Sequence, residues 1–320
     1  MIRAGIDCGT NSIRLLVLGD NGEPLARRNT ITRLGHGVDR TGAFDPERVA
    51  ASIQVVRGYA EECRRLGVQV IRFGATSATR DATNREIFTT PVTRILGVAP
   101  EVIPGTEEAA LSFRGAIGSL PGYERYGCVV VDLGGGSTEI VEGTGTAGSA
   151  YSMNVGSVRL TERWMTDALA LSAAQREAVI ADVTAALDEA LQTVRLKDAT
   201  RLVGVSGTIA TVTAYALTLA GAQPTELQGV RLSLEEVLGA SDALSRMSVS
   251  ELGALAFIHP GRVGVTAVGA LIWHTVVSRI VAECAARGHV IKEVTTSLND
   301  ILDGLTLTAV APFSPGGDPA

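Results

Sequence analysis

The chain alternates short apolar runs with stretches in which apolar residues recur every three or four positions. Cys128–Val131 and Leu202–Val205 have the length and composition of buried strands. Between residues 49 and 63 the apolar side chains follow a helical period, with Asp45-Pro46 as the cap before them and Gly67 as the expected stop. This alternation of strands and helices predicts an α/β protein.

Other segments add elements of both kinds. Ile13–Leu18 and Val68–Phe73 predict strands, and Thr106 is the expected N-cap of the helix that follows it. Ser172–Gln175 and Ser233–Glu236 each match a capping box at the start of a helix. The longest apolar stretch, residues 265–277, contains a histidine and predicts a buried helix rather than a membrane span.

One pattern occurs twice. The segment from Asp7 to Val17 and the segment from Asp132 to Glu142 both read as a strand, an aspartate, a glycine-containing turn with serine and a second strand. They are 125 residues apart (132 − 7), which is about the length of one domain. Two ordinary turns are the alternative, but the matching aspartates favour a duplicated hairpin. Glycine in such a turn lets backbone amides approach an anion closely.

The repeat sets the expected domain organisation. We predict a first domain over residues 1–125, with residues 300–312 packing back on it, and a second domain over residues 126–299. The last residues, 311–320, hold three prolines and two glycines, and residues 313–320 are expected to form a loose tail. A third phosphate-type loop, Ser206–Thr208, lies between the predicted strand at 202–205 and an apolar helix, where a helix N-terminus offers an anion site.

Composition narrows the chemistry. The 28 basic residues include only two lysines, Lys197 and Lys292, and neither follows a glycine, which excludes a lysine-based phosphate loop. Arginine or backbone amides must therefore bind any phosphate. The net charge of −6 gives no general nucleic-acid surface. The four cysteines are far apart in the sequence, which predicts reduced thiols in a cytoplasmic protein. Asp7 interrupts the N-terminal segment before the apolar region of a signal peptide could form, and no membrane partner is expected.

The motifs together resemble the exopolyphosphatase and guanosine pentaphosphate phosphatase family, and its short actinobacterial members in particular. The most specific are Asp132-Leu-Gly-Gly-Gly-Ser-Thr-Glu139 and the preceding Gly105-Thr-Glu-Glu-Ala109. Asp7–Ser12, Thr76–Asp81, Asn154–Ser157, Gly204–Thr208 and Ser297–Gly304 also match. The resemblance implies two duplicated actin-like (ribonuclease-H-like) domains with a phosphate-binding cleft between them.

The resemblance also implies a reaction and its residues. A terminal phosphate would be hydrolysed from a phosphoanhydride chain, with Glu108 as the general base and Glu107 only favouring the helix dipole. Asp132, Glu139 and Asp7 would hold Mg²⁺ (or Mn²⁺), an ion that takes few protein carboxylates and keeps water and phosphate ligands.

The remaining candidate residues fall into two groups. Those expected to cradle phosphate are Gly9, Thr10, Asn11, Ser12, Gly134, Gly135, Gly136, Ser137, Thr138, Gly156, Ser157, Ser206, Gly207 and Thr208. Those expected near distal substrate groups are the arginines Arg14, Arg262, Arg80 and Arg159.

The resemblance makes polyphosphate the expected substrate and guanosine pentaphosphate the close alternative. The chain has no residues left for the extra C-terminal domains of long family members, so a preference for short polyphosphate is expected. Family habit suggests a homodimer. A sugar or acid kinase of the same superfamily and a non-catalytic alarmone sensor are the rival functions. ATP-dependent phosphorylation of a metabolite would indicate the first, and tight guanosine phosphate binding without phosphate release the second.

Overall fold

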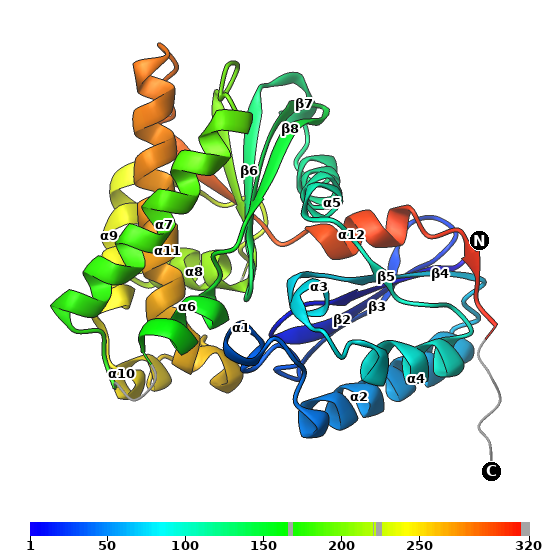
Figure 1. Ribbon diagram of the computed structural model, residues 1–320. Coiled ribbons are helices and arrows are strands. Elements are labelled where there is room, and N and C mark those ends of the chain that lie inside the picture. Colours follow the sequence, from blue (N-terminus) through cyan, green and yellow to red (C-terminus); the bar gives the residue numbers. More distant parts are fainter. Residues whose placement is uncertain (166–168, 220, 222–225, 315–320) are drawn as a thin grey trace. The chain divides into compact units, whose positions relative to one another are not determined.

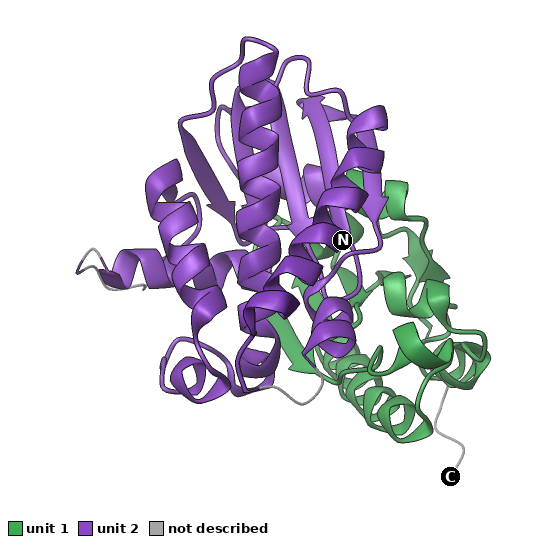
Figure 2. Ribbon diagram, turned by 60° about the vertical axis from the view of Figure 1, so that its left-hand side comes forward, with its two compact units in different colours: residues 1–111, 301–320 green, residues 112–300 purple. Residues whose placement is uncertain are grey.

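The computed structural model describes residues 1–165, 169–219, 221 and 226–314. It divides into two compact units, unit 1 with residues 1–111 and 301–320 and unit 2 with residues 112–300 (Figure 2). Each unit holds one mixed sheet with helices packed against it (Figure 1). The predicted α/β class is confirmed.

The elements of unit 1 are β1 (Arg3–Cys8), β2 (Ser12–Leu18), β3 (Pro24–Ile31), α1 (Val38–Thr41), α2 (Pro46–Arg65), β4 (Val70–Ala75), α3 (Ser77–Asp81), α4 (Glu86–Leu96), β5 (Glu101–Val102), α12 (Ile301–Leu307) and β12 (Ala311–Pro312). Helix α5 (Gly105–Gly118) passes from unit 1 into unit 2.

The elements of unit 2 are a 3₁₀ turn (Tyr123–Arg125), β6 (Cys128–Leu133), β7 (Thr138–Thr144), β8 (Thr146–Met153), α6 (Ser157–Trp164), α7 (Ala173–Thr193), β9 (Arg201–Val205), α8 (Gly207–Leu219), β10 (Arg231–Ser233), α9 (Leu234–Arg246), α10 (Val249–Gly253), a second 3₁₀ turn (Pro260–Arg262), α11 (Val263–Ala286) and β11 (Glu293–Ser297).

The two sheets repeat one strand order. In unit 1, β1 and β2 form an antiparallel hairpin, β3 extends it, and β4 pairs parallel with β1 on the other side. In unit 2, β6, β7, β8 and β9 take the same places with the same directions. A further parallel strand follows in each, β5 beside β4 and β11 beside β9. The repeat expected from Asp7 and Asp132 is therefore a repeat of the whole sheet.

Helix caps define several of the helix ends as the sequence predicts. Asp45 accepts hydrogen bonds from the amides of Glu47 and Arg48 at the start of α2. Ser172 and Ser233 form capping boxes at the starts of α7 and α9. The expectation for Thr106 was wrong, because α5 already begins at Gly105 and its first turn is closed by the carbonyl of Pro104.

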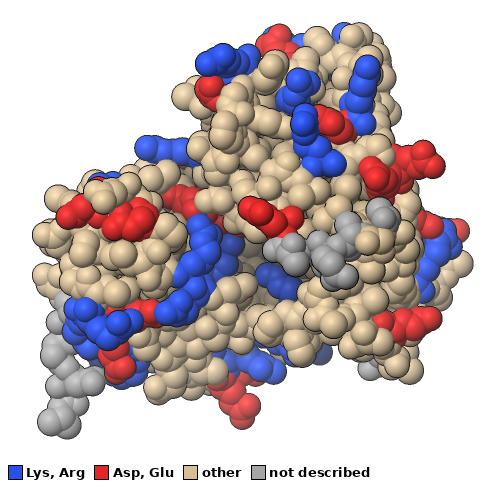
Figure 3. All heavy atoms as spheres, turned by 180° about the vertical axis from the view of Figure 1, so that it is seen from behind, with Lys and Arg blue, Asp and Glu red and all other residues tan. Residues whose placement is uncertain are grey.

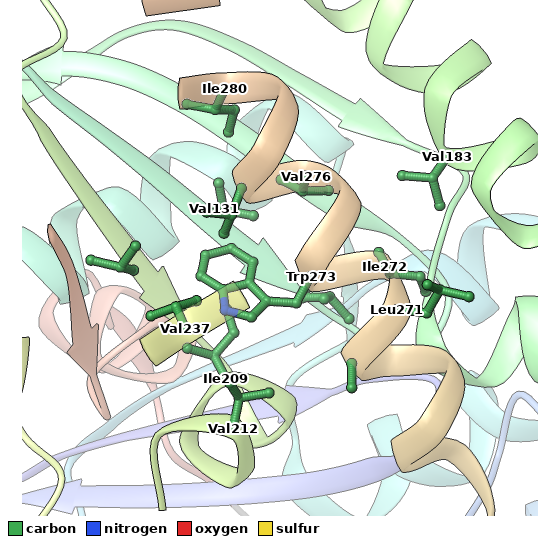
Figure 4. Packing of buried hydrophobic residues seen from close by; sticks show 14 of the residues in the cluster. Val131, Val183, Ile209, Val212, Val237, Leu271, Ile272, Trp273, Val276 and Ile280 are labelled. Carbon is green, nitrogen blue, oxygen red and sulfur yellow. The ribbon is translucent and has the colours of Figure 1, made fainter. Parts of the chain in front are cut away.

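The core of unit 2 surrounds α11. Trp273 is 1% exposed and packs among Val131 of β6, Ile209 of α8 and Val237 of α9 (Figure 4). By length and composition α11 could cross a membrane, but 61% of its apolar window is buried. It is the buried helix that residues 265–277 predicted, and its hydrophobicity is explained by the core it fills.

The boundary between the units differs from the expected one at residue 125. It falls inside α5, after Leu111. The first half of this helix packs through Leu111 on Ile301 and Leu305 of α12, which belong to unit 1. In the second half, Gly115 lies directly against the backbone of Asp300, which belongs to unit 2.

The C-terminal segment is more ordered than its composition suggested. Residues 311–312 form β12 against β4, and the amide of Phe313 donates to the carbonyl of Gln69. The rest of the expected tail, residues 315–320, lies outside the described residues. Pro312 has no amide hydrogen to donate, and it is tolerated in β12 because this two-residue strand lies at the edge of the sheet.

Candidate active site

The duplicated hairpins close with the same turn. The amide of Gly9 donates to the carbonyl of Ser12 at 3.0 Å, and the amide of Gly134 donates to that of Ser137 at 2.9 Å. Gly9 and Gly134 therefore shape the turns with their own N–H groups. These two N–H groups are already hydrogen-bonded, so a phosphate at either turn would have to be bound by the other amides of the turn. In the first hairpin these are the amides of Thr10 and Asn11.

Directly opposite residues distinguish the two hairpins. In unit 1, Asp7 faces Arg14 across β1 and β2, and Arg14 donates from Nε and Nη2 to Oδ2 of Asp7 at 2.8 and 2.7 Å. In unit 2, the equivalent positions are Asp132 and Glu139, facing each other across β6 and β7. The same place in the fold thus holds an ion pair in one unit and two carboxylates in the other.

The carboxylates of unit 2 suit a divalent cation. Asp132 is 8% exposed and Glu139 1%. Like charges directly opposite each other weaken a ladder, so this placement points to a function. Carboxylate oxygens are the ligands that Mg²⁺ prefers, and it needs only one or two of them beside water and substrate phosphate. No group of three His, Cys, Asp or Glu that could hold a metal occurs in the part of the chain that the structure describes.

Two serines hold these carboxylates. Ser112 of α5 donates from Oγ to Oδ2 of Asp132 at 2.5 Å, and Ser152 of β8 donates from Oγ to Oε1 of Glu139 at 2.7 Å. Neither serine is among the residues predicted from the sequence. One signal was present for Ser112, which comes four residues after Glu108 and so lies on the same side of α5.

Glu108 has the environment of a proton acceptor. Its side chain is nearly buried in unit 1, and Arg80 donates from Nη1 to its Oε2 at 2.6 Å and to the carbonyl of Ile103. Burial raises the pKa of Glu108 to about 7, although Arg80 acts to lower it. A carboxyl with a pKa near neutrality can exchange protons at physiological pH. Arg80, expected near distal substrate groups, is thus the partner of the predicted base.

Asp7 and Arg14 act on the same carboxyl. Asp7 raises the pKa of Glu108 and Arg14 lowers it, both by their charges. Unit 1 therefore brings Asp7, Arg14, Arg80 and Glu108 into one electrostatic group. Glu107 points to a different partner, because its Oε1 accepts from Nη2 of Arg72 at 2.5 Å. It is a structural residue as well as a first-turn carboxylate that favours the helix dipole.

The turn Gly134–Ser137 between β6 and β7, called the glycine loop below, packs against the start of α6. The amide of Ser157 donates to the carbonyl of Gly134 at 3.0 Å, and Nε of Arg159 donates to that of Gly136 at 2.7 Å. A Cβ on Gly156 would overlap the peptide between Gly135 and Gly136. Gly156, Ser157 and Arg159 therefore hold the glycine loop in place through these contacts.

The first loop is braced from the segment after β3. The amides of Thr32 and Arg33 donate to the carbonyl of Asn11, and the amide of Gly35 donates to that of Thr10. Among the described residues, no hydrogen-bond partner reaches the buried Oγ1 of Thr10. A buried hydroxyl in this state has its donor available for a ligand such as phosphate.

The third loop combines backbone strain, a hydroxyl and an arginine. Ser206 has φ of 118°, and its buried Oγ meets no partner in the described part of the chain. A Cβ on Gly207 would overlap the guanidinium of Arg262, which therefore packs directly on the first residue of α8. A guanidinium and a helix N-terminus are both positive, and an anion between them would relieve their repulsion. This arrangement fits the predicted phosphate role of Ser206, Gly207 and Arg262.

Two of the predicted phosphate loops, Gly134–Ser137 and Ser206–Thr208, lie near each other in unit 2. A Cβ on Gly269 of α11 would press on the side chains of both Thr208 and Ser157. The start of α6, which braces the glycine loop, thus lies beside the start of α8, which carries Arg262. The remaining loop residues, Ser12, Ser137 and Thr138, lie at strand ends or turns, and Oγ1 of Thr138 donates to the carbonyl of Val155.

Both Lys and Arg (blue) and Asp and Glu (red) occur on the face drawn in Figure 3, and neither sign covers the whole face. A polyanion would therefore be bound by local groups such as those above rather than by the overall charge, which is −6.

Comparison with known proteins identifies the family. The sequence model of the Ppx/GppA phosphatase family matches residues 19–289. The chain belongs to this family. It is 41% identical to exopolyphosphatase 2 of Mycobacterium tuberculosis, over 95% of this chain and 97% of that protein. The resemblance inferred from the motifs is confirmed, and with it the prediction of a phosphatase.

Solved structures agree with the fold. An exopolyphosphatase-like protein matches with a TM-score of 0.90 and 41% identity, covering 96% of this chain and 98% of its own. The Ppx/GppA family member of Aquifex aeolicus matches with a TM-score of 0.74 and 25% identity, covering 95% of both chains. An exopolyphosphatase of Cytophaga hutchinsonii, 21% identical, shares the fold with a TM-score of 0.85 over 96% of this chain and 97% of its own.

Proposed function

We propose that this Ppx/GppA phosphatase is an exopolyphosphatase that releases the terminal phosphate of inorganic polyphosphate, with short chains preferred. The observation that carries the proposal is the buried Glu108, whose pKa of about 7 suits a general base in a family of phosphatases. The relative from Mycobacterium tuberculosis, which shares 41% of residues, carries the name exopolyphosphatase.

In the proposed reaction, Glu108 accepts a proton from a water molecule as the water oxygen bonds to the terminal phosphorus. The bridging P–O bond breaks, and the shortened chain leaves with the electron pair of that bond. Arg80 holds the carboxylate of Glu108 in place through the 2.6 Å hydrogen bond. Phosphoryl transfer depends mostly on positioning and on charge neutralisation, which the loop amides and arginines would supply.

Asp132 and Glu139 would hold Mg²⁺ or Mn²⁺, which when bound neutralises charge on the terminal anhydride. Asp7 is a weaker candidate than it was from sequence, because its Oδ2 already pairs with Arg14. We assign Asp7 the role of holding Arg14. Ser206 and Arg262 would bind a substrate phosphate at the start of α8, where helix and guanidinium are both positive.

Guanosine pentaphosphate is the second candidate substrate, because release of its terminal phosphate also breaks a phosphoanhydride bond and because the motifs resemble those of guanosine pentaphosphate phosphatases. A homodimer, a cytoplasmic location and the absence of nucleic-acid and membrane partners stay predictions. The sugar kinase and the non-catalytic sensor are the rival functions. An assay of phosphate release separates the two hydrolase substrates, and a binding measurement and a phosphorylation measurement beside it separate the sensor and the kinase.

The assay measures phosphate released by the purified chain with Mg²⁺ from short polyphosphate, polyphosphate hundreds of units long, guanosine pentaphosphate and ATP. We expect the highest kcat/KM with short polyphosphate. Faster turnover of the long chains would contradict the short-chain preference, and release from guanosine pentaphosphate alone would make it the substrate. Tight guanosine phosphate binding without any release would make the protein a sensor, and ATP-dependent phosphorylation of a small metabolite would make it a kinase.

A further inference from the structure

A row of four polar side chains crosses the end of the unit 2 sheet. Ser152 of β8 lies opposite Glu139 of β7 in the ladder, and Glu139 lies opposite Asp132 of β6. Ser112 of α5 adds the fourth member by its 2.5 Å hydrogen bond to Asp132. Residues directly opposite each other in a ladder point to the same face of the sheet, so two hydroxyls flank two carboxylates on one face.

The equivalent row of unit 1 has different chemistry. There Asp7 lies opposite Arg14, and Arg14 lies opposite Asn29 of β3. The donor that orients Asp7 is a guanidinium, which brings a positive charge with it. The donors that orient Asp132 and Glu139 are hydroxyls, which fix the direction of a carboxylate but add no charge to it.

Burial makes this orientation effective. Ser112 is 0% exposed, so its hydroxyl cannot donate to a water molecule in place of Asp132 unless the packing around α5 opens. A buried carboxylate that loses its donor can rotate, and an oxygen in the wrong place costs affinity for a cation with strict octahedral geometry. Hydrogen-bond partners of metal ligands commonly change affinity by 10- to 100-fold when they are removed.

We propose that Ser112 and Ser152 are positioning residues that set the carboxylates of Asp132 and Glu139 for a divalent cation. This inference rests on the proposed function, which assigns the cation to those two carboxylates. The serines do not touch substrate. They fix the two carboxylates in the binding arrangement before the cation arrives, which lowers the cost of binding it.

The test is a calorimetric titration of the full chain with Mn²⁺ in the presence of inorganic phosphate, so that the readout is binding and not turnover. We expect Ser112→Ala and Ser152→Ala each to raise the Kd for Mn²⁺ by about 10-fold or more. Ser152→Thr keeps the hydroxyl on a strand, where threonine is favoured, and should bind Mn²⁺ as the unchanged protein does. Ser241→Ala is the control, a buried helical serine of unit 2 that donates to the carbonyl of Val237.

Asp132→Asn separates the two ideas. If this variant binds Mn²⁺ normally, the cation is not held by Asp132 and that part of the proposed function is wrong. If Asp132→Asn loses binding while both serine-to-alanine variants keep it, the proposed cation site stands and the positioning role is overturned. Should Ser112→Ala fail to fold, the partly buried Ser152, compared as alanine and as threonine, decides the question.

Discussion

Arg80 donates from Nη1 to Oε2 of Glu108 at 2.6 Å, so the arginine expected at a distal substrate position is the direct partner of the expected base. Burial raises the pKa of Glu108 to about 7, and the pairing with Arg80 stabilises the ionised form of this carboxyl. Without Arg80 the proton would be held more tightly still, because both its charge and its hydrogen bond favour the ionised form.

Glu108→Gln should leave substrate binding nearly intact and lower kcat by at least about 10²-fold, because an amide cannot accept the proton of the attacking water. Single-turnover phosphate release measures the loss. Glu107→Gln is the matched control on the same helix, since Glu107 pairs with Arg72 and is assigned no chemical role. Turnover close to normal in Glu108→Gln would remove this residue from the role of base.

The pH profile should follow the protonation of Glu108. Because the base must be ionised, kcat/KM is expected to fall as the pH drops through about 7. Arg80→Gln removes a charge and a hydrogen bond that lower the pKa, so the falling limb should move to higher pH. Ionisation of the substrate is the same for both proteins, which makes the shift between them the decisive number. An unmoved limb would show that Arg80 does not act through Glu108.

Arg14→Ala should raise KM more than it lowers kcat if Arg14 also binds a distal phosphate. It should shift the acidic limb in the same direction as Arg80→Gln but by less, because the charge of Arg14 has a smaller effect on the pKa of Glu108 than that of Arg80. Steady-state kinetics across pH measure both effects. A drop in kcat at constant KM would instead mean that Arg14 serves only to hold Asp7.

Gly207→Ala should weaken substrate binding by displacing Arg262, since the new Cβ would overlap the guanidinium. We expect KM to rise about tenfold or more, in line with the loss of one charge-assisted hydrogen bond. Gly239→Ala, in α9, is the control because its Cβ would meet nothing within 4 Å. Equal KM values for the two variants would argue against a phosphate site at the start of α8.

Trp273→Ala should lower the free energy of unfolding by about 3–5 kcal/mol, the usual cost of deleting a large buried aromatic side chain. Trp273 fills the centre of unit 2 (Figure 4), and its removal leaves a cavity beside β6, which carries Asp132. Urea unfolding measures the loss. A change below 1 kcal/mol would mean that the neighbours of Trp273 collapse into the space.

Much of the fold could be predicted because it depends on local signals. Each of these signals acts within a few residues. They are the caps at Asp45, Ser172 and Ser233, the apolar strand at 128–131, and the two separate hairpins that begin at Asp7 and Asp132. The expected domain boundary differed from the observed one because it depends on long-range packing. Whether half of α5 belongs to one unit or the other is decided by Ile301 and Leu305, far along the chain.

The sequence by itself determined the residue types of the site: two aspartate hairpins, a glutamate at the start of a helix and hydroxyl-rich turns. Only the tertiary structure decided which of them are partners. Register places Arg14 against Asp7 but Glu139 against Asp132, and packing brings Arg80 to Glu108 and Ser112 to Asp132. The last two pairings join residues 28 and 20 positions apart, so no local pattern encodes them. They nevertheless set the orientation of Asp132 and the pKa of Glu108, on which the proposed chemistry depends.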